Sequence, residues 1–459
     1  MKSLVIKEQS IPVAEEADVV VLGSGSAGVA AAVSAARSGL KTVIVEKAPY
    51  PGGLLTFPMP LMGCLDLKGN LIVHGVFEEL MDKLKKMGGR SDYILSPRRG
   101  VSMVITDTEL MKHCVLEMLV EARVKLYLHT YFVESIVEQD KIKAIVVVNK
   151  SGKQAIAARQ FIDCSGDGDL VAASGAPYNR GDANTGETQV STLLFVMGNV
   201  DIKKFKLALT GYPEKYVSDI VASDFFARND FFLFVGMKEL IRQVRTEQGL
   251  DLPNDRLSII PLLRQDEAIC EVTRVHIDAT DGNQLTDGEI ETRKQVFEYI
   301  KLLNKWIPGF ENSYLKVTAP QLGVRESRRI QGKYTLTGDD VLSARRFSDE
   351  IALGCFGIDV HSKNETKVVR PEKSPFGIPY GCLIPAKVNN LLVAGRNIST
   401  TREAHAATRV MATCMGTGHA AGCAAAIAVE SNISPGEIDY KVLRSRLKEQ
   451  NAYLPDYCE

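Results

Sequence analysis

VVVLGSGSAGVAAAVSAARSG, residues 19–39, is the stretch that predicts the fold of this chain. Asp18 to Leu22 is β-branched and free of glycine and proline, as in a buried strand. A helix of small residues is expected from Val29 to Arg37, and Gly39 ends it. A second strand follows at residues 41–45. The order strand, turn, helix, strand predicts a βαβ unit with parallel strands.

The turn between the first strand and the helix has the pattern G-x-G-x-x-G. Gly23 permits the tight turn, Gly25 lets the backbone approach a pyrophosphate, and Gly28 lets the helix pack closely on the strand. The N-terminus of the helix offers unpaired N–H groups to an anion, and Ser26 and Ala27 in the turn are expected to contact the cofactor. A generic glycine turn would explain this packing equally well.

Glu46, at the end of the second strand, distinguishes a dinucleotide-binding turn from a generic glycine turn. Its carboxylate stands where it can accept the ribose hydroxyls of an adenosine, so a bound dinucleotide is expected. A carboxylate at this position disfavours a 2′-phosphate and leaves NAD or FAD. The following residues favour FAD, because a glycine pair suits a cofactor that continues onward to a large ring. The residues expected along this part of the cofactor are Lys47, Gly52, Gly53 and Leu54.

Composition and charge exclude several classes. The 459 residues are 45% hydrophobic and 24% charged with a formal net charge of −1, so neither nucleic acid nor a membrane is an expected partner. The nine cysteines are scattered without a C-x-x-C pair, which argues against disulfide scaffolds and zinc sites and suits a reducing cytoplasm. No metal site and no secretory signal are expected. The longest weakly polar run, residues 420–429, is too short to cross a membrane.

Longer stretches give a family resemblance. Residues 19–56 look like the start of flavoproteins of the glutathione-reductase superfamily, and more closely resemble the FAD-dependent oxidoreductases allied to the fumarate reductase and succinate dehydrogenase flavoproteins. FIDCSGDGDLVAASGAP (161–177), GVRESRRIQGKYTLTGDDV (323–341) with IDVH (358–361), and residues 378–426 carry the match further. Residues 200–270 are the least similar to the family.

The resemblance implies a Rossmann-like, doubly wound α/β domain that binds FAD and is assembled from both ends of the chain. We expect this domain at 1–198 and 370–459, with an inserted α+β substrate or cap domain at 199–369. The alternating residues 124–166 independently predict a β-meander, in which Val133 would lie near the adenine.

The resemblance also implies further cofactor contacts. Ser165, Gly166 and Asp167 would lie near the ribityl chain, with Asp167 bonding a sugar-like hydroxyl, although a plain Asp-Gly turn also fits. Gly395 and Arg396 end a buried strand at 391–394, where the family closes on its cofactor.

A second glycine-rich helix is expected from Cys414 to Ile427. In the family it directs its N-terminus at the flavin ring, where the helix dipole would stabilise negative charge on the reduced ring. The alternative is simple packing, because the spacing of Gly418 and Gly422 lets another backbone come close. The residues expected at the ring are Gly416, Gly418, His419, Ala420 and Ala421.

Catalytic candidates are polar residues in apolar surroundings. Arg325 and Arg328 would share one face of a helix and capture a carboxylate, or else form an Arg–Glu network at a domain junction. His361 and His405 are candidate acids or bases, with a structural role as the alternative, and Tyr380 is a further candidate.

These observations predict an FAD-dependent oxidoreductase that acts on a small polar substrate by hydride transfer to or from flavin N5. A second G-x-G-x-x-G is absent, so a ping-pong cycle without an NAD(P) domain is expected. Two alternatives stay open: a flavin-dependent isomerase, hydratase or lyase, and a non-catalytic FAD-binding protein. The sequence also leaves open the electron acceptor or donor, the oligomeric state, and covalent attachment of FAD to His74, Cys64 or His405.

Overall fold

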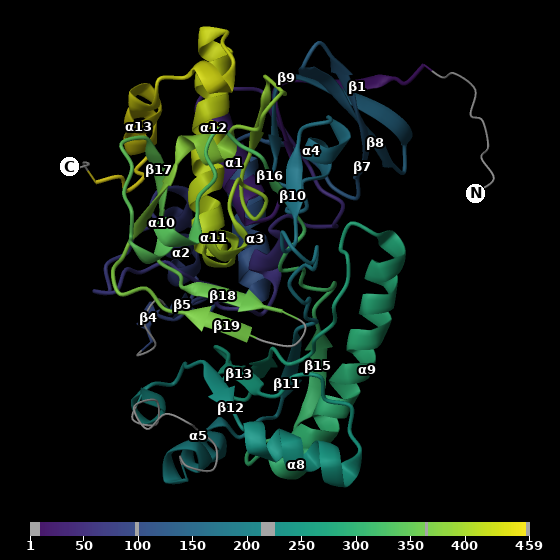
Figure 1. The fold of residues 1–459 in the computed structure, drawn as a ribbon, viewed down its shortest axis with the longest axis vertical. Helices are drawn as coiled ribbons and strands as arrows, with labels where there is room; N and C mark the ends of the chain where they lie inside the picture. Colours follow the sequence, from purple (N-terminus) through teal and green to yellow (C-terminus); the bar gives the residue numbers. More distant parts are fainter. Residues whose placement is uncertain (1–9, 97–100, 213–224, 363–365, 456–459) are drawn as a thin grey trace.

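A computed structural model describes residues 10–96, 101–212, 225–362 and 366–455, and Figure 1 shows two lobes stacked along its long axis. The upper lobe contains a parallel sheet in the order β6-β2-β1-β9, with β21 beside the end of β9. Register pairs such as Val45 with Tyr127 and Val393 with Asp163 align the carboxyl ends of these strands at one edge. The parallel strands are β1 (Val13–Leu22), β2 (Thr42–Val45), β6 (Lys125–Tyr127), β9 (Gly152–Asp163) and β21 (Leu391–Val393).

The parallel α/β sheet predicted from residues 19–45 is therefore confirmed. Helix α1 (Ser26–Arg37) begins three residues earlier than Val29, immediately after Gly25. It lies between β1 and β2, which pair in parallel from Val19 with Thr42. The expected meander is also present, because β7 (Tyr131–Glu138) and β8 (Lys141–Asn149) run antiparallel to one another and onto the first half of β9.

Helices cover the sheet, and α12 (Met411–Ser431) lies at the centre of this layer (Figure 1). Within the described part of the chain, α12 alone has the length and hydropathy of a membrane span, but 94% of its most apolar window is buried inside the protein. Core helices that are apolar all round have the same composition. The other helices of this lobe are α2 (Val76–Lys86), α3 (Thr108–Glu121), α4 (Asp169–Ala173), α10 (Gly338–Leu342), α11 (Arg402–Thr408) and α13 (Tyr440–Glu449).

The lower lobe is built on an antiparallel sheet in the order β12-β13-β14-β11-β15. Its apolar core includes a cluster of phenylalanines, in which Phe205 meets Phe234 and Phe310 edge to face. Its elements are β11 (Phe195–Gly198), α5 (Ile202–Gly211), β12 (Phe234–Gly236), α8 (Lys238–Gln248), β13 (Leu257–Pro261), β14 (Ala268–Cys270), α9 (Gly282–Trp306) and β15 (Tyr314–Thr318).

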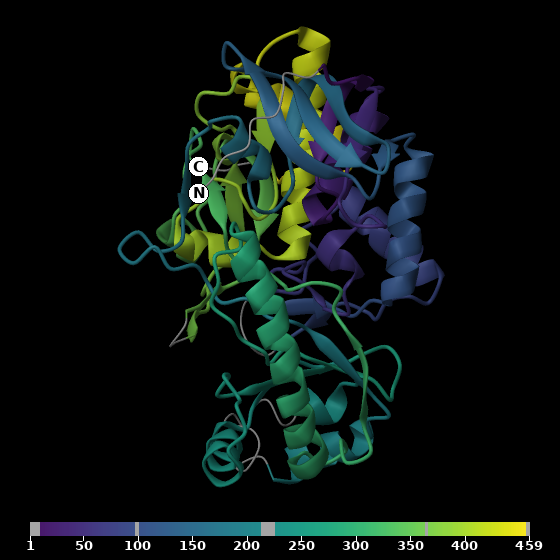
Figure 2. The same ribbon diagram turned by 90° about the vertical axis from the view of Figure 1, so that its right-hand side faces the viewer.

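Helix α9 begins at the junction with the upper lobe and extends along the lower one (Figure 2). Its N-cap is Asp281, whose carboxylate accepts hydrogen bonds from the backbone N–H groups of Asn283 and Gln284. The side chain of Thr286 lies inside the helix and donates to the carbonyl of Gly282. The aspartate N-cap therefore satisfies the first backbone N–H groups, which the helix itself leaves without partners.

Short strands and turns complete the upper lobe and join it to the lower one. They are β3 (Leu61–Met62), β4 (Ile94–Leu95), β5 (Ser102–Val104), β10 (Tyr178–Arg180), β16 (Arg328–Ile330), β17 (Glu350–Gly354), β18 (Ile358–His361), β19 (Thr366–Val369), β20 (Phe376–Pro379), and the 3₁₀ turns η1 (Gly53–Thr56), η2 (Tyr380–Leu383) and η3 (Pro435–Glu437).

The domain boundaries at 198 and 370 stay a prediction. Core packing favours a shorter insertion, because β11 belongs to the lower sheet, whereas Leu336, Val341 and the strands β17 and β18 pack into the core of the upper lobe.

Candidate functional site

A cleft of about 380 Å³ lies where the carboxyl ends of the parallel strands face the lower lobe. Open α/β sheets bind ligands at this edge. The upper lobe lines the cleft with the loop after β1, the segment after β2, and the turns after β9 and β21. Leu285 and Glu289 of α9, together with residues 321–325, line it from the other side.

The glycine turn forms one end of the cleft. Gly23 has φ +89°, and a β-carbon there would lie 2.5 Å from the carbonyl oxygen of Cys164. A β-carbon at Gly28 would lie 1.9 Å from the carbonyl oxygen of Gly23, so only glycine permits this approach of helix and turn. Gly25 differs, because a β-carbon there would meet nothing within 4 Å and would occupy the space of the cleft.

Helix α1 begins at this turn without a side-chain cap on its first N–H groups. These groups and the positive end of the helix dipole therefore face the cleft beside Ser26 and Ala27, which line it. The arrangement suits a pyrophosphate, as the motif predicts.

Glu46 also lines the cleft, and its carboxylate is fixed in position. Oε2 accepts from the backbone N–H of Ser24 at 2.8 Å and from its hydroxyl at 2.7 Å, and Oε1 accepts from the N–H of Ala48 at 2.8 Å. Both lone pairs of Oε2 are used by Ser24, whereas Oε1 keeps one lone pair for a ribose hydroxyl. The carboxylate ties the glycine turn to the end of β2, and its predicted contact with a ribose stays a prediction.

The segment after β2 follows the same wall. Lys47, Gly53 and Leu54 line the cleft, with Gly53 close enough to Gly25 that a β-carbon would lie 2.9 Å from the Cα of Gly25. Gly52 has φ +118° and donates its N–H to the carbonyl of Ser24, so it shapes the loop without lining the cleft.

The turn after β9 brings Ser165, Gly166 and Asp167 to the cleft. Asp167 Oδ1 accepts from Arg396 Nη2 at 2.7 Å and from the hydroxyl of Ser327 at 2.7 Å. Burial alone would raise the pKa of Asp167, but Arg396 and the Ser327 hydrogen bond lower it, so the group is an anion. Asp167 therefore positions Arg396, which lines the cleft beside Gly395; the predicted bond to a sugar hydroxyl stays untested.

The second glycine-rich helix corrects the sequence prediction. Helix α12 begins at Met411, not at Cys414, and these two residues line the cleft. The glycines come later in the helix and serve close packing. A β-carbon at Gly418 would lie 2.1 Å from the carbonyl of Ala27, and one at Gly422 would lie 2.3 Å from that of Ala31.

The remaining residues expected at the ring do not line the cleft either. Gly416 faces Ala352, and Ala420 and Ala421 are fully buried in the core. His419 Nε2 lies 3.2 Å from Gln450 Oε1, where burial lowers the pKa of the imidazole to about 4. The N-terminus of α12 faces the cleft, but its first turn, not its glycines, makes that contact.

Val133 also lies outside the lining of the cleft. It is 47% exposed on β7. His74, Cys64 and His405 do not line the cleft. The structure therefore does not support a covalent bond between FAD and any of these residues.

The arginine pair is separated by the fold. Residues 325–327 are extended coil and Arg328 starts β16, so no helix places Arg325 and Arg328 on one face. Arg328 points to the carboxylate of Asp169 at 3.0 Å. Arg325 does line the cleft, where its guanidinium donates to Glu271 Oε1 at 2.6 Å and to the hydroxyl of Thr192 at 2.7 Å.

The alternative that the sequence left open, an Arg–Glu network at the junction, is present beside this site. Glu326 is 1% exposed and pairs with both Arg329 and Arg402. Arg402 also pairs with Asp182 at 3.2 Å. Buried carboxylates need such partners, so this cluster ties β16 to α11 and to the turn after β10.

The two histidine candidates and the tyrosine are held in the protein interior. His361 Nε2 lies 3.1 Å from Asp359 Oδ2, and its pKa is lowered by burial and by the charge of Arg325. His405 is 1% exposed. Burial, and secondly the positive charge of neighbouring arginines, lowers the pKa of its imidazole well below the usual value. Tyr380 donates its hydroxyl to the carbonyl of Pro435 at 2.9 Å. None of the three lines the cleft.

Arg409 and Glu271 are cleft residues that the sequence prediction missed as site residues. Arg409 Nη2 donates to the carbonyl of Asp359 at 3.2 Å, whereas its Nε has no hydrogen-bond partner among the described residues. Burial and the positive charge of Arg325 lower the pKa of Arg409 to about 10. The position of Arg409 directly before α12 was the available signal. Glu271 directly follows the least family-like part of the chain, residues 200–270, and had no such signal.

The cleft thus contains two kinds of surface. One end offers glycine backbone, a helix start and Glu46; the other offers Arg325, Arg409 and Glu271. A long ligand with a pyrophosphate, a ribose and a further reactive group would lie along the first end and reach the second. The open space at Gly25 is the observation that fits FAD, since a β-carbon there would fill the place of the cofactor.

Comparison with known proteins supports this assignment. A family model described as FAD dependent oxidoreductase matches residues 18–447. A 3-oxosteroid 1-dehydrogenase from Mycolicibacterium smegmatis is 64% identical over 39 residues, which are 8% of this chain and 7% of that protein. A thioredoxin reductase from Ureaplasma parvum is 37% identical over 68 residues, 14% of this chain and 22% of that protein. The matched segments therefore cover only a small part of these curated relatives.

Solved structures match over a greater length at low identity. A geranylgeranyl bacteriochlorophyll reductase-like protein from Thermoplasma acidophilum is 14% identical with a TM-score of 0.46, covering 95% of this chain and 83% of the other. The p-nitrophenol 4-monooxygenase of Pseudomonas putida is 13% identical with a TM-score of 0.44, covering 94% and 84%. The family, the FAD cofactor and the enzyme class predicted from the sequence are confirmed by the family match.

Proposed function

This chain belongs to the family of FAD-dependent oxidoreductases, and we propose that it transfers a hydride between FAD and a small substrate that carries a carboxylate. One observation carries the proposal: the cleft that begins at Gly25 and Glu46 is continuous with the surface formed by Arg325 and Arg409. Cofactor and substrate would therefore share one cavity.

The two arginines supply the charge that a carboxylate needs. Glu271 neutralises part of this charge and fixes Arg325, since Nη2 of the arginine lies 2.6 Å from Oε1 of the glutamate. The unpartnered Nε of Arg409 leaves a donor for a ligand. A guanidinium favours carboxylates because its N–H groups form paired hydrogen bonds to both oxygens.

FAD supplies the group that accepts or donates the electron pair. The protein binds the substrate, holds the reacting carbon in place and limits access of water. Leu285 and Leu322 add apolar surface on the side of the lower lobe, opposite the glycine turn. A single shared cleft supports a ping-pong cycle, because the first product must leave before a second small molecule enters.

Anaerobic mixing of the FAD-loaded protein with small hydroxy acids tests this function. Oxidation would remove a hydride from the carbon and a proton from its hydroxyl, so the visible flavin absorption would bleach and the keto acid would appear in equal amount. The opposite direction of transfer is tested by mixing the chemically reduced protein with keto acids and unsaturated dicarboxylic acids. In this direction the visible flavin absorption would return.

The matched controls are the methyl esters of the same acids. We expect the acids to react and the esters to react at least tenfold more slowly, because the esters lack the charge that the arginines bind. Equal rates for acids and esters, or no reaction of the flavin in either direction, would contradict the proposal.

A further inference from the structure

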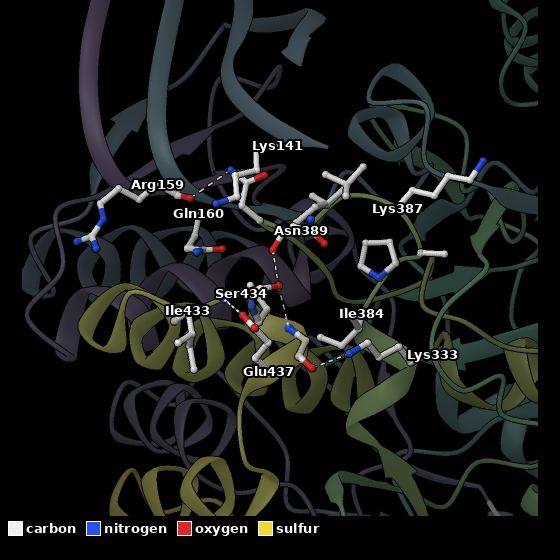
Figure 3. Close-up of a pocket in the computed structure, with 18 of the residues that line it drawn as sticks. Lys141, Arg159, Gln160, Lys333, Ile384, Lys387, Asn389, Ile433, Ser434 and Glu437 are labelled. Carbon is white, nitrogen blue, oxygen red and sulfur yellow. Dashed lines mark hydrogen bonds between the residues drawn. The ribbon is translucent and has the colours of Figure 1, made fainter. Parts of the chain in front are cut away.

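A second cavity, of about 790 Å³, lies near the beginning of β21, away from the flavin cleft (Figure 3). Its walls are the segment 384–391, the middle of β9, the last turn of α12 and the turn η3. A cavity of this volume is in the range that holds a small organic ligand.

Gln160 is the unusual residue in this cavity. It lies on the face of β9 that Ile162 shares, and Ile162 belongs to the apolar core. Its side chain is 7% exposed, yet Oε1 has no hydrogen-bond partner in the part of the chain that the structure describes. Buried acceptors are normally satisfied, so this oxygen calls for a donor from a ligand or an ordered water.

The charges around the cavity are mostly positive. Lys141, Arg159, Lys333 and Lys387 line it, and Glu437 is the one carboxylate among its lining residues. Lys333 Nζ donates to the carbonyl of Gly436 at 2.6 Å and forms no ion pair with a described carboxylate. Figure 3 shows the amide of Gln160 and the ammonium of Lys333 directed into the cavity from opposite sides.

Arg159 is only partly available, since Nη2 donates to the carbonyl of Val429 near the end of α12. The lysines therefore supply most of the charge for a ligand. An ammonium group binds phosphate well as a compact charge. The cavity combines this anion preference with a buried acceptor that needs an O–H or N–H donor.

We propose that this cavity binds a small molecule in which a phosphate is attached to a hydroxyl-bearing sugar. The phosphate would meet Lys141 and Lys333, and a sugar hydroxyl would donate to Gln160 Oε1. The ligand is separate from the cofactor. Leu391, at the start of β21, lines this cavity, and Ala394, directly after β21, lines the flavin cleft about 10 Å further along the extended chain. This inference is independent of the proposed carboxylate substrate.

Calorimetric titration of the FAD-loaded protein tests the site, because the loaded cofactor keeps the probes out of the flavin cleft. The probes are ribose 5-phosphate, AMP, inorganic phosphate and neutral ribose. We expect one site per chain for ribose 5-phosphate or AMP, with inorganic phosphate at least tenfold weaker and ribose without detectable binding. The preference between the first two identifies a sugar phosphate or a nucleotide as the source of the phosphate.

Two variants locate the binding. Gln160→Met removes the acceptor at nearly constant shape and should lower the affinity about tenfold, while the melting temperature is kept or raised because no internal hydrogen bond is lost. Lys141→Ala with Lys333→Ala should lower the affinity further. Lys153→Ala is the matched control, since this lysine pairs with Glu134 on the meander outside the cavity and should leave binding unchanged.

Three results would overturn the inference. They are no binding of either sugar-containing phosphate, inorganic phosphate binding as tightly as both, and binding that survives Gln160→Met and the lysine double variant unchanged.

Discussion

Gly418 of α12 lies against the backbone of Ala27 in α1, so closely that a β-carbon at position 418 would be 2.1 Å from the Ala27 carbonyl oxygen. Ala27 itself lines the flavin cleft. The helix that follows the cofactor turn and the helix near the end of the chain are therefore packed as one unit. This contact supports the glycine-turn end of the cleft from behind.

Gly418→Ala should destabilise the protein strongly, because the added methyl group meets backbone and cannot be accommodated without separating the helices. We expect a loss of about 2–3 kcal/mol in the free energy of unfolding, measured by denaturant titration of the apoprotein. Gly282→Ala at the start of α9 is the control, since a β-carbon there meets nothing within 4 Å. Equal stability of both variants would contradict the packing role.

Gly25→Ala should weaken FAD binding without changing the stability of the protein. The backbone of Gly25 has φ −67°, which alanine adopts, and its β-carbon would enter open space in the cleft. The stability of the apoprotein should be unchanged, whereas the affinity for FAD should fall at least tenfold, about 1.4 kcal/mol. Equilibrium titration of the apoprotein with FAD measures this, and unaltered affinity would place the pyrophosphate elsewhere.

Arg409→Met should weaken substrate binding while the flavin stays bound. Loss of a charge-assisted hydrogen bond costs about 1.5–3 kcal/mol, so KM for the carboxylate substrate should rise roughly 10- to 100-fold. The matched control is Arg180→Met, which removes an exposed pair with Asp278 outside the cleft. If KM is the same in both variants, Arg409 is not a substrate ligand.

Tyr380→Phe should leave turnover unchanged, because its hydroxyl is bonded to the Pro435 carbonyl and lies outside the cleft. We expect a loss of about 1 kcal/mol in stability from the unsatisfied buried carbonyl. Steady-state kinetics together with thermal unfolding measure both effects. A large fall in kcat at constant stability would restore Tyr380 as a catalytic residue.

The protein should lose stability in mild acid through His419. Burial lowers the pKa of this imidazole from 6.5 to about 4, so between these values the unfolded chain binds a proton that the folded protein does not. The contribution of His419 to the free energy of unfolding is complete above pH 6.5 and decreases as the pH falls toward 4. Below pH 4 this contribution no longer changes. Between pH 6.5 and 4, the total loss in the free energy of unfolding from this group is about 3 kcal/mol.

Unfolding measured at several pH values checks this, with His419→Gln as the comparison. The variant should have a shallower slope between pH 6.5 and 4, because glutamine does not titrate in that range. Identical slopes would assign the acid sensitivity to other groups.

The sequence determined the parts of this protein that depend on neighbouring residues. A β-branched strand, a glycine turn and a helix of small residues are encoded within residues 18–37, so the parallel unit and its dinucleotide character were predictable. Glu46 was predictable for the same reason, as it ends the next strand. The glycine pair Gly52 and Gly53 then favoured FAD, and the family resemblance agreed with it.

Only the tertiary structure decided which side chains meet at the cleft. Arg325, Arg409 and Glu271 come from three distant segments, and their approach depends on how the lobes pack. The same packing moved Arg328, Tyr380 and the glycines of α12 away from the cleft. Local sequence fixes backbone conformation through sterics and short-range hydrogen bonds, whereas contacts between distant segments are set by the burial of whole apolar faces, which no short motif encodes.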